Sequence, residues 1–167
     1  MRKQNWLILV TLALVSVFAI GCSGGQKANI GEVSKGKDDQ AAIKEVVEAY
    51  YTECKNFAWE NFDKEAGLEF WTAEGRQQYL AEEADSFAES VEQQKISNQL
   101  KGIEIQDINI EDNKAVVNLV SQEEWSSEVT EGLNGTFQGY GQLELQKNEQ
   151  IWQIENYNFH LVKIEKQ

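Results

Sequence analysis

The chain has 167 residues, a formal net charge of −13 and no proline. A charge of this sign repels nucleic acid phosphates, so we expect no nucleic-acid partner. With only two cysteines and one histidine, a structural zinc site is close to excluded, and no Asp-rich loop has the spacing of a calcium site. The composition therefore predicts no metal site and gives no sign of a cofactor.

The first segment has the pattern of an export signal. Arg2 and Lys3 precede an uncharged apolar run at 6–20, and Gly21-Cys22 follows at once. This order is typical of a secretory signal that is cut after small residues. The run is shorter than the ~20 apolar residues that a membrane-spanning helix usually needs, which favours a signal peptide over a transmembrane anchor.

The ending Ala19-Ile20-Gly21-Cys22 resembles the lipobox of bacterial lipoproteins, although Leu is commoner where Ala19 stands. This resemblance implies that residues 1–21 are a lipoprotein signal peptide and that Cys22 carries the lipid. We therefore expect an exported protein whose N-terminal lipid anchors it to the outer face of the bacterial cytoplasmic membrane, or to the outer membrane if the cell has one.

Residues 22–37 are rich in glycine and serine and poor in apolar side chains. Such a segment cannot bury enough surface to fold, and it predicts a flexible tether. We expect a single folded domain over residues 38–167, because the remaining length is enough for one core and too short for two.

The first half of this domain has helical periodicity. Apolar residues recur at three- and four-residue spacing from Ile43 to Ala58, which predicts an amphipathic helix over 38–59. A short helical piece is expected over about 61–71. Thr72 can cap a third helix that runs to about residue 95, and its buried side would be formed by Leu80, Ala84, Phe87, Ala88 and Val91.

From residue 99 onward, alternation with a period of two replaces the helical spacing. In the first strand the parity of the apolar residues changes near Gln106-Asp107, which predicts a β-bulge. A turn at 111–114 leads to a second strand over 115–125, and residues 128–135 form the next connection.

The third strand should place one set of residues on a single face: Phe137, Gly139, Gly141, Leu143 and Leu145. Its two glycines would allow strong bending or the close approach of a bulky group. After a turn at 147–150, a last strand carries apolar residues whose parity changes near Glu155-Asn156.

Helices followed by four strands with short local turns predict an α+β fold with a four-stranded antiparallel sheet. The segments 42–51, 68–75 and the Trp-Gln-Ile at 152–154 resemble the NTF2-like superfamily, also called cystatin-like or SnoaL-like. Over residues 38–163 this resemblance implies N-terminal helices packed on a curved sheet that forms a cone. Members include enzymes and non-catalytic modules, so the resemblance assigns no activity, and no catalytic residue can be carried over.

Few residues of the chain are candidates for catalysis. A general base would have to be His160, but its strand parity favours a half-exposed position. Cys54 could pair with His160 as a nucleophile, yet its place in the apolar stripe favours a buried thiol. The acidic pairs Glu82-Glu83 and Glu123-Glu124 are interpreted as solvated faces.

Aromatic residues are numerous, and a cone lined by them would suit an apolar or ring-shaped ligand. Most of them must form the core; the residues that we expect in a pocket are Tyr51, Trp71, Tyr140, Trp152 and His160. We hypothesise a lipid-anchored, non-catalytic module that binds a protein partner or a small apolar ligand. Two alternatives stay open: an enzyme that transfers a proton on an apolar ring substrate, and an envelope assembly module that forms a homodimer.

Overall fold

The computed structural model describes residues 38–164, so the predicted signal peptide, the lipidation site Cys22 and the tether lie outside the described residues. Within this range the helices precede four strands, β1 (Ile96–Glu111), β2 (Lys114–Ser127), β3 (Gly135–Asn148) and β4 (Ile151–Lys163). The strands form one antiparallel sheet in the order β1-β2-β3-β4. The predicted α+β fold with a four-stranded antiparallel sheet is confirmed. No helix in the described part of the chain is both long and apolar enough to cross a bilayer.

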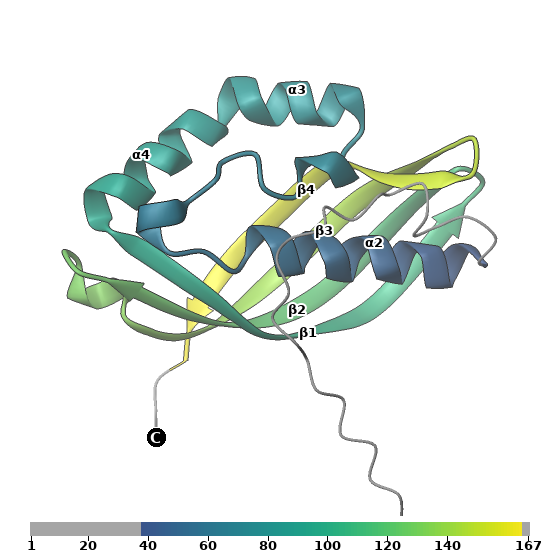
Figure 1. Ribbon diagram of the computed structural model, residues 1–167. Helices are drawn as coiled ribbons and strands as arrows, with labels where there is room; N and C mark the ends of the chain where they lie inside the picture. The colour runs from purple at the N-terminus through teal and green to yellow at the C-terminus, as the bar shows by residue number, and fades with distance from the viewer. Residues whose placement is uncertain (1–37, 165–167) are drawn as a thin grey trace, which may run out of the picture.

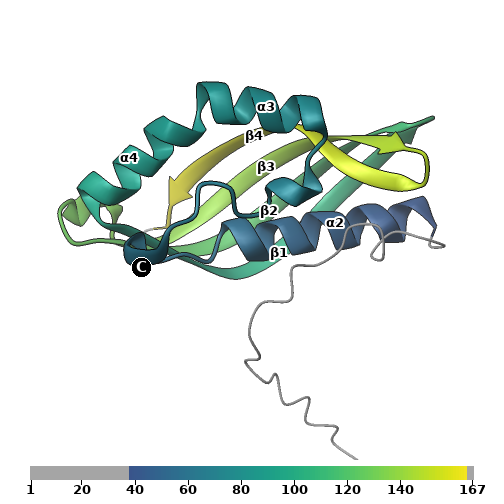
Figure 2. The same ribbon diagram turned by 45° about the horizontal axis from the view of Figure 1, so that its top comes forward.

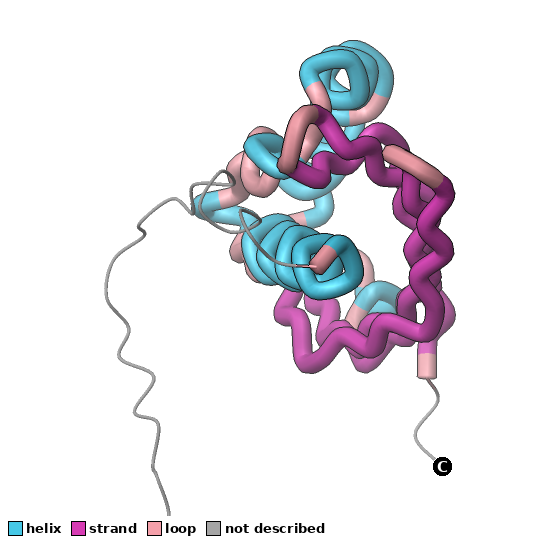
Figure 3. The backbone as a smooth tube through the Cα atoms, turned by 90° about the vertical axis from the view of Figure 1, so that its right-hand side faces the viewer, coloured by secondary structure: helices cyan, strands magenta, loops and turns pink. Residues whose placement is uncertain are grey.

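The first helix, α2 (Asp39–Cys54), lies in the hollow of the curved sheet (Figures 1 and 3). Asp38 is its N-cap, and the Asp38 carboxylate accepts a hydrogen bond from Ala41 N at 2.8 Å. The predicted apolar stripe is buried against the sheet through Ala42, Ile43, Val46, Val47, Tyr50 and Tyr51.

This helix ends at Cys54 instead of continuing to residue 59 as predicted. Phe57 exchanges two backbone hydrogen bonds with Asn98 of β1, which pull the chain into an extended conformation. Asn56 Nδ2 also donates to the carbonyl of Thr52 and so satisfies one of the free carbonyls at the helix end. Contacts with a distant strand therefore override the local helical spacing.

The helix predicted over 61–71 is wrong. Only two short 3-10 turns form here, η1 (Trp59–Asn61) and η2 (Leu68–Phe70). The Asp63 carboxylate accepts a hydrogen bond from Glu65 N at 2.9 Å, a local bond that competes with helix formation. Gly67, with a φ of 79°, turns the chain just before η2.

The third predicted helix is two helices, α3 (Ala73–Glu82) and α4 (Ala84–Gln94). Thr72 caps α3 as predicted, since its Oγ1 accepts a hydrogen bond from Gly75 N at 3.1 Å. The helix is interrupted at Glu83, whose φ of −124° and ψ of −39° depart from helical values. At this point the helical axis bends, so that α3 lies beside β4 while α4 leads down to β1 (Figures 1 and 2).

Both β-bulges that the strand parity predicted are confirmed. The register shifts between Ile105 and Asp107 in β1, and again in β4 where Glu155 is skipped opposite Glu144 and Leu145. A further shift lies between Leu100 and Gly102. Because bulges bend a strand and increase its twist, the sheet curls around α2 (Figure 3).

The buried apolar residues form two clusters. The larger cluster fills the space between α2 and the middle of the sheet, and its fully buried members include Ile43, Val46, Leu143, Trp152 and Ile154. The smaller one lies near the end of α4 and consists of Val91, Ile96, Trp125 and Phe137, with partly buried rings packed around them.

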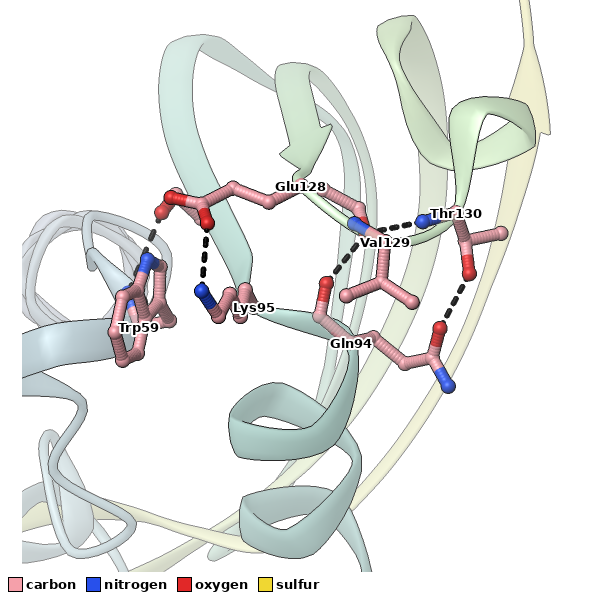
Figure 4. A network of polar contacts seen from close by, with 8 residues as sticks. Trp59, Gln94, Lys95, Glu128, Val129 and Thr130 are labelled. Atoms are coloured by element: carbon pink, nitrogen blue, oxygen red, sulfur yellow. Dashed lines mark hydrogen bonds and ion pairs between the residues drawn. The ribbon is translucent and has the colours of Figure 1, made fainter.

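A polar cluster fastens the end of α4 to the connection between β2 and β3 (Figure 4). Lys95 Nζ donates to Glu128 Oε2 at 2.8 Å and lies 4.9 Å from the centroid of the Trp59 ring. Ser127 Oγ donates to the carbonyl of Gln94. Both charged side chains are exposed, so their ion pair contributes little free energy and mainly keeps these segments together.

Candidate functional site

A cavity of about 590 Å³ lies where α2 ends, between the segment 55–66, the helices α3 and α4, and strand β4. We call it the aromatic cavity, because most of its apolar wall consists of the rings of Tyr50, Phe57, Phe62, Tyr79, Phe87, Trp125, Tyr157 and Phe159. Several rings meet edge to face, as in Phe57–Phe62 at 5.0 Å and Phe62–Phe87 at 5.4 Å between centroids. Such walls suit an apolar or ring-shaped ligand.

Two glycines of β3 let bulky groups lie close to the sheet beside this cavity. A Cβ on Gly139 would lie 2.4 Å from Ser121 Oγ and 2.5 Å from the ring of Phe159. A Cβ on Gly141 would lie 2.4 Å from the Tyr51 hydroxyl oxygen. The predicted close approach of a bulky group to these glycines is confirmed, and the Phe159 ring that lies against Gly139 is part of the cavity wall.

A buried carboxylate lies behind the wall. Glu123 is 0% exposed, and its oxygens accept hydrogen bonds from Ser121 Oγ at 2.7 Å, Asn98 Nδ2 at 2.9 Å and Trp125 Nε1 at 2.9 Å. Three donors supply what a buried charge needs in place of water. Trp125, which is part of the cavity wall, is therefore held in place by the hydrogen bond that its Nε1 donates to the Glu123 carboxylate.

The interpretation of Glu123-Glu124 as a solvated face is wrong for Glu123 and right for Glu124. Alternate residues of β2, from Ala115 to Ser127, all lie on the buried face, and Glu123 belongs to that series. The alternation of β2 could have predicted that Glu123 is buried, because Glu123 lies on the same side of the strand as Trp125. Glu82 and Glu83 are both exposed, as predicted.

The thiol and the phenolic hydroxyls around the cavity are held in their neutral forms. Burial raises the pKa of the Cys54 thiol to about 11. Burial also raises the pKa of the Tyr50, Tyr51 and Tyr157 hydroxyls above the usual range. These side chains are therefore protonated at neutral pH, and they can donate hydrogen bonds.

Two of these hydroxyls are enclosed by the protein. The Tyr51 and Tyr157 oxygens have no exposed surface, and the side chain of Tyr157 interacts with that of Tyr51, which partly offsets the effect of burial on the pKa of Tyr51. Although the ring of Tyr157 is part of the cavity wall, its hydroxyl therefore does not face the cavity.

Lys55 contributes a positive charge to the cavity wall. It is the C-cap residue of α2, and its Nζ lies 3.7 Å from the centroid of the Phe159 ring and 5.8 Å from that of Tyr157. The other lysine of the wall, Lys64, is paired with Asp85 at 2.5 Å. Lys55, in contrast, forms no ion pair with any carboxylate of the described residues.

The five residues expected to line a pocket lie elsewhere. Tyr51 and Trp152 are fully buried in the larger core cluster, and Trp71 is buried beside them. Tyr140 and His160 are exposed on the outer face of the sheet, where their rings stack with centroids 4.9 Å apart. None of the five belongs to the wall of the aromatic cavity. Nor does the structure bring Cys54 together with His160, because the thiol lies at the cavity and the imidazole on the outer face.

A second hollow, of about 690 Å³, is lined mainly by amide and hydroxyl side chains near Asn56, Asn98 and Asn134. Asn56 Oδ1 accepts a hydrogen bond from Leu100 N, and Asn134 Oδ1 accepts one from Ser127 N. These side chains therefore hold the backbone in place. Within residues 38–164, no group of three His, Cys, Asp or Glu side chains is arranged to hold a metal ion.

Comparison with known proteins gives little to place beside this geometry. No family model and no curated protein matches the chain. A solved structure of the Bdellovibrio bacteriovorus protein Bd1075 is similar, with 17% sequence identity and a TM-score of 0.44 over 80% of this chain and 44% of that one. The chain thus spans less than half the length of the protein that it matches.

Proposed function

We propose that this chain is a non-catalytic binding module of the NTF2-like type, which takes a small apolar or ring-shaped ligand in the aromatic cavity. The observation that carries this proposal is a cavity of about 590 Å³ whose wall is built mostly of aromatic rings. Pockets of this size with apolar walls and a few polar groups are the usual form of a small-molecule site.

The chemistry of the wall supports binding in preference to catalysis. General acid–base or nucleophilic catalysis needs a group whose pKa is matched to the working pH. Burial raises the pKa of the Cys54 thiol to about 11, and Glu123 already accepts three hydrogen bonds. His160 lies on the opposite face of the sheet from the cavity.

The same proposal places the module at the cell envelope through a lipid on Cys22, which the lipobox resemblance of residues 19–22 supports. Its test is metabolic labelling with a fatty acid in a bacterial host. The full-length chain should incorporate the label, and Cys22→Ser should abolish it and leave uncleaved precursor. Continued labelling of Cys22→Ser would remove the anchor from the proposal.

Ligand binding is tested with 2-naphthamide, a neutral ring compound small enough for the cavity, in an NMR titration of the full-length chain. For a ligand of this size we expect a Kd of about 1 mM or tighter. Ser90→Trp, which places an indole at the cavity wall, should weaken binding about tenfold or more.

The matched control is Glu89→Trp, on the same helix and exposed, outside the cavity wall. It adds the same side chain and should leave the affinity unchanged. Binding that fails to saturate, or that responds equally to both variants, would contradict a site in the aromatic cavity.

A further inference from the structure

We infer that the ligand of the aromatic cavity is an organic anion, with an apolar ring or chain against the aromatic wall and a carboxylate-like group bound by Lys55. This inference rests on the proposed function of the cavity and adds the charge of the ligand to it.

The first observation is a cation without a counter-ion. Lys55 is half-buried in a chain with 28 acidic and 15 basic residues, yet it forms no ion pair within the described part of the structure. Its Nζ instead lies on the Phe159 ring, 3.7 Å from the centroid. A cation over an aromatic ring is attracted by its π electrons, and the ammonium can still form a charge-assisted hydrogen bond to an anion that reaches it.

The second observation is that the other cation of the cavity wall is already neutralised. Lys64 Nζ lies 2.5 Å from Asp85 Oδ1, so Lys55 is the cation of the described wall that is left to bind an anion. The Tyr51 and Tyr157 hydroxyls do not compete for this role, because neither oxygen has exposed surface and the two side chains interact with each other. An ammonium at the wall of an aromatic cavity is the group that a carboxylate on a ring compound would pair with.

The acidic groups near the cavity do not cancel the preference of the cavity for an anionic ligand. The Glu123 carboxylate is occupied by three donors and lies behind the wall. Asp63 and Glu83 belong to the wall but are exposed to solvent, where water screens them. The anionic group of the ligand therefore lies at Lys55, the unpaired cation of the described wall.

Three probes with the same naphthalene ring test the inference: 2-naphthoate, 2-naphthamide and 2-naphthylmethylammonium. In NMR titrations of the full-length chain, 2-naphthoate should bind about tenfold more tightly than 2-naphthamide, as expected for one hydrogen bond to a charged group. The ammonium probe should bind most weakly, because it brings a second positive charge next to Lys55.

Variants then assign the preference to its residues. Lys55→Met keeps the apolar stem, and it should lower the affinity for 2-naphthoate to that for 2-naphthamide while leaving the latter within about twofold. Lys44→Met removes one positive charge from the exposed face of the same helix and should retain the tenfold preference.

The outcomes separate this inference from the function on which it rests. If 2-naphthamide binds and 2-naphthoate binds no better, the inference is overturned and the proposed cavity function stands. If none of the probes binds, both fail. A preference that survives in Lys55→Met would also overturn the inference. If Lys55→Met does not fold, the three probes on the wild-type chain and on Lys55→Gln decide it.

Discussion

The two ends of α2 lie in different kinds of interior. Along its first turns the helix packs on the sheet without a gap, and Ile43, Val46 and Trp152 are each 0% exposed. At Cys54 the helix stops, and beyond it the sheet is covered by a loop and by α3 and α4. There the rings of Phe57, Phe87 and Phe159 are only partly buried, and they surround the aromatic cavity.

This difference shows that the same strand pattern can build a dry core or a pocket. The inner faces of β2 and β3 alternate in the same way at both ends. A regular helix fills the hollow with evenly spaced side chains, whereas an irregular segment does not match the sheet surface. Where the covering segment is irregular, volume remains for a ligand.

The sharpest test of this comparison is a large truncation at each end. Trp152→Ala should lower the free energy of unfolding by about 3–5 kcal/mol, because it empties a fully buried site. It also removes the hydrogen bond that Trp152 Nε1 donates to Asp39 Oδ1. Phe87→Ala, at the cavity wall, should cost less than half as much, since one side of its ring already borders empty volume. Urea unfolding of both variants measures the difference, and equal losses would mean that the two ends are packed alike.

The buried carboxylate at the cavity end should be the next most sensitive site. Glu123→Ala leaves Ser121 Oγ, Asn98 Nδ2 and Trp125 Nε1 without their acceptor, and we expect a loss of about 2–4 kcal/mol in urea unfolding. The neighbouring Glu124→Ala removes the same group from an exposed position and should change stability by less than about 0.5 kcal/mol. Similar values for the two variants would show that Glu123 is not buried in solution.

A smaller effect should come from the glycines that bring bulky groups onto the sheet. In Gly139→Ala the new methyl group would meet Ser121 Oγ and the Phe159 ring, so we expect a loss of about 1–3 kcal/mol from overpacking. Gly102→Ala is the control, because nothing lies within 4 Å of its added Cβ. Its stability should stay unchanged or rise by up to about 1 kcal/mol. Thermal unfolding measures the stability of both variants. A Gly139→Ala variant more stable than Gly102→Ala would contradict the close packing at Gly139.

The smallest predicted effect concerns the N-terminal end of α2, where the core is closely packed, and it depends on pH. Hydrogen bonds from Lys147 Nζ at 2.6 Å and Trp152 Nε1 at 3.0 Å lower the pKa of the Asp39 carboxyl. The ionised form therefore stabilises the fold above the ordinary pKa of about 3.8, and this stabilisation is lost as the pH falls through the lower pKa of the folded state. The carboxylate is 38% exposed, so solvent screening keeps the effect under about 1 kcal/mol. Asp39→Asn should show a flatter loss of stability between pH 5 and 2, and an unchanged profile would rule out this contribution.

Features that depend on neighbouring residues could be predicted from the sequence. The N-cap at Thr72, the buried face of β3 and the bulges near residues 106 and 155 follow from local hydrogen bonding and from the period of two. The end of α2 could not be predicted, because the Phe57–Asn98 bridge joins residues far apart in the chain. The cavity wall was missed for the same reason, since the helices, the loop and β4 each supply a part of it.

By itself, the sequence determined that helices precede four strands and that the apolar positions of each strand share a buried face, because periodicity is a property of the local backbone geometry. Glu123 follows the same period, although it was predicted to be solvated. Only the tertiary structure decided which aromatic rings became core and which became the cavity wall. Aromatic side chains occur in both places, and the difference lies in which segments cover them. Trp152 is fully buried in the core cluster formed with α2, whereas the rings of Tyr157 and Phe159 on the same strand lie near the C-terminal end of that helix and form part of the cavity wall with Lys55.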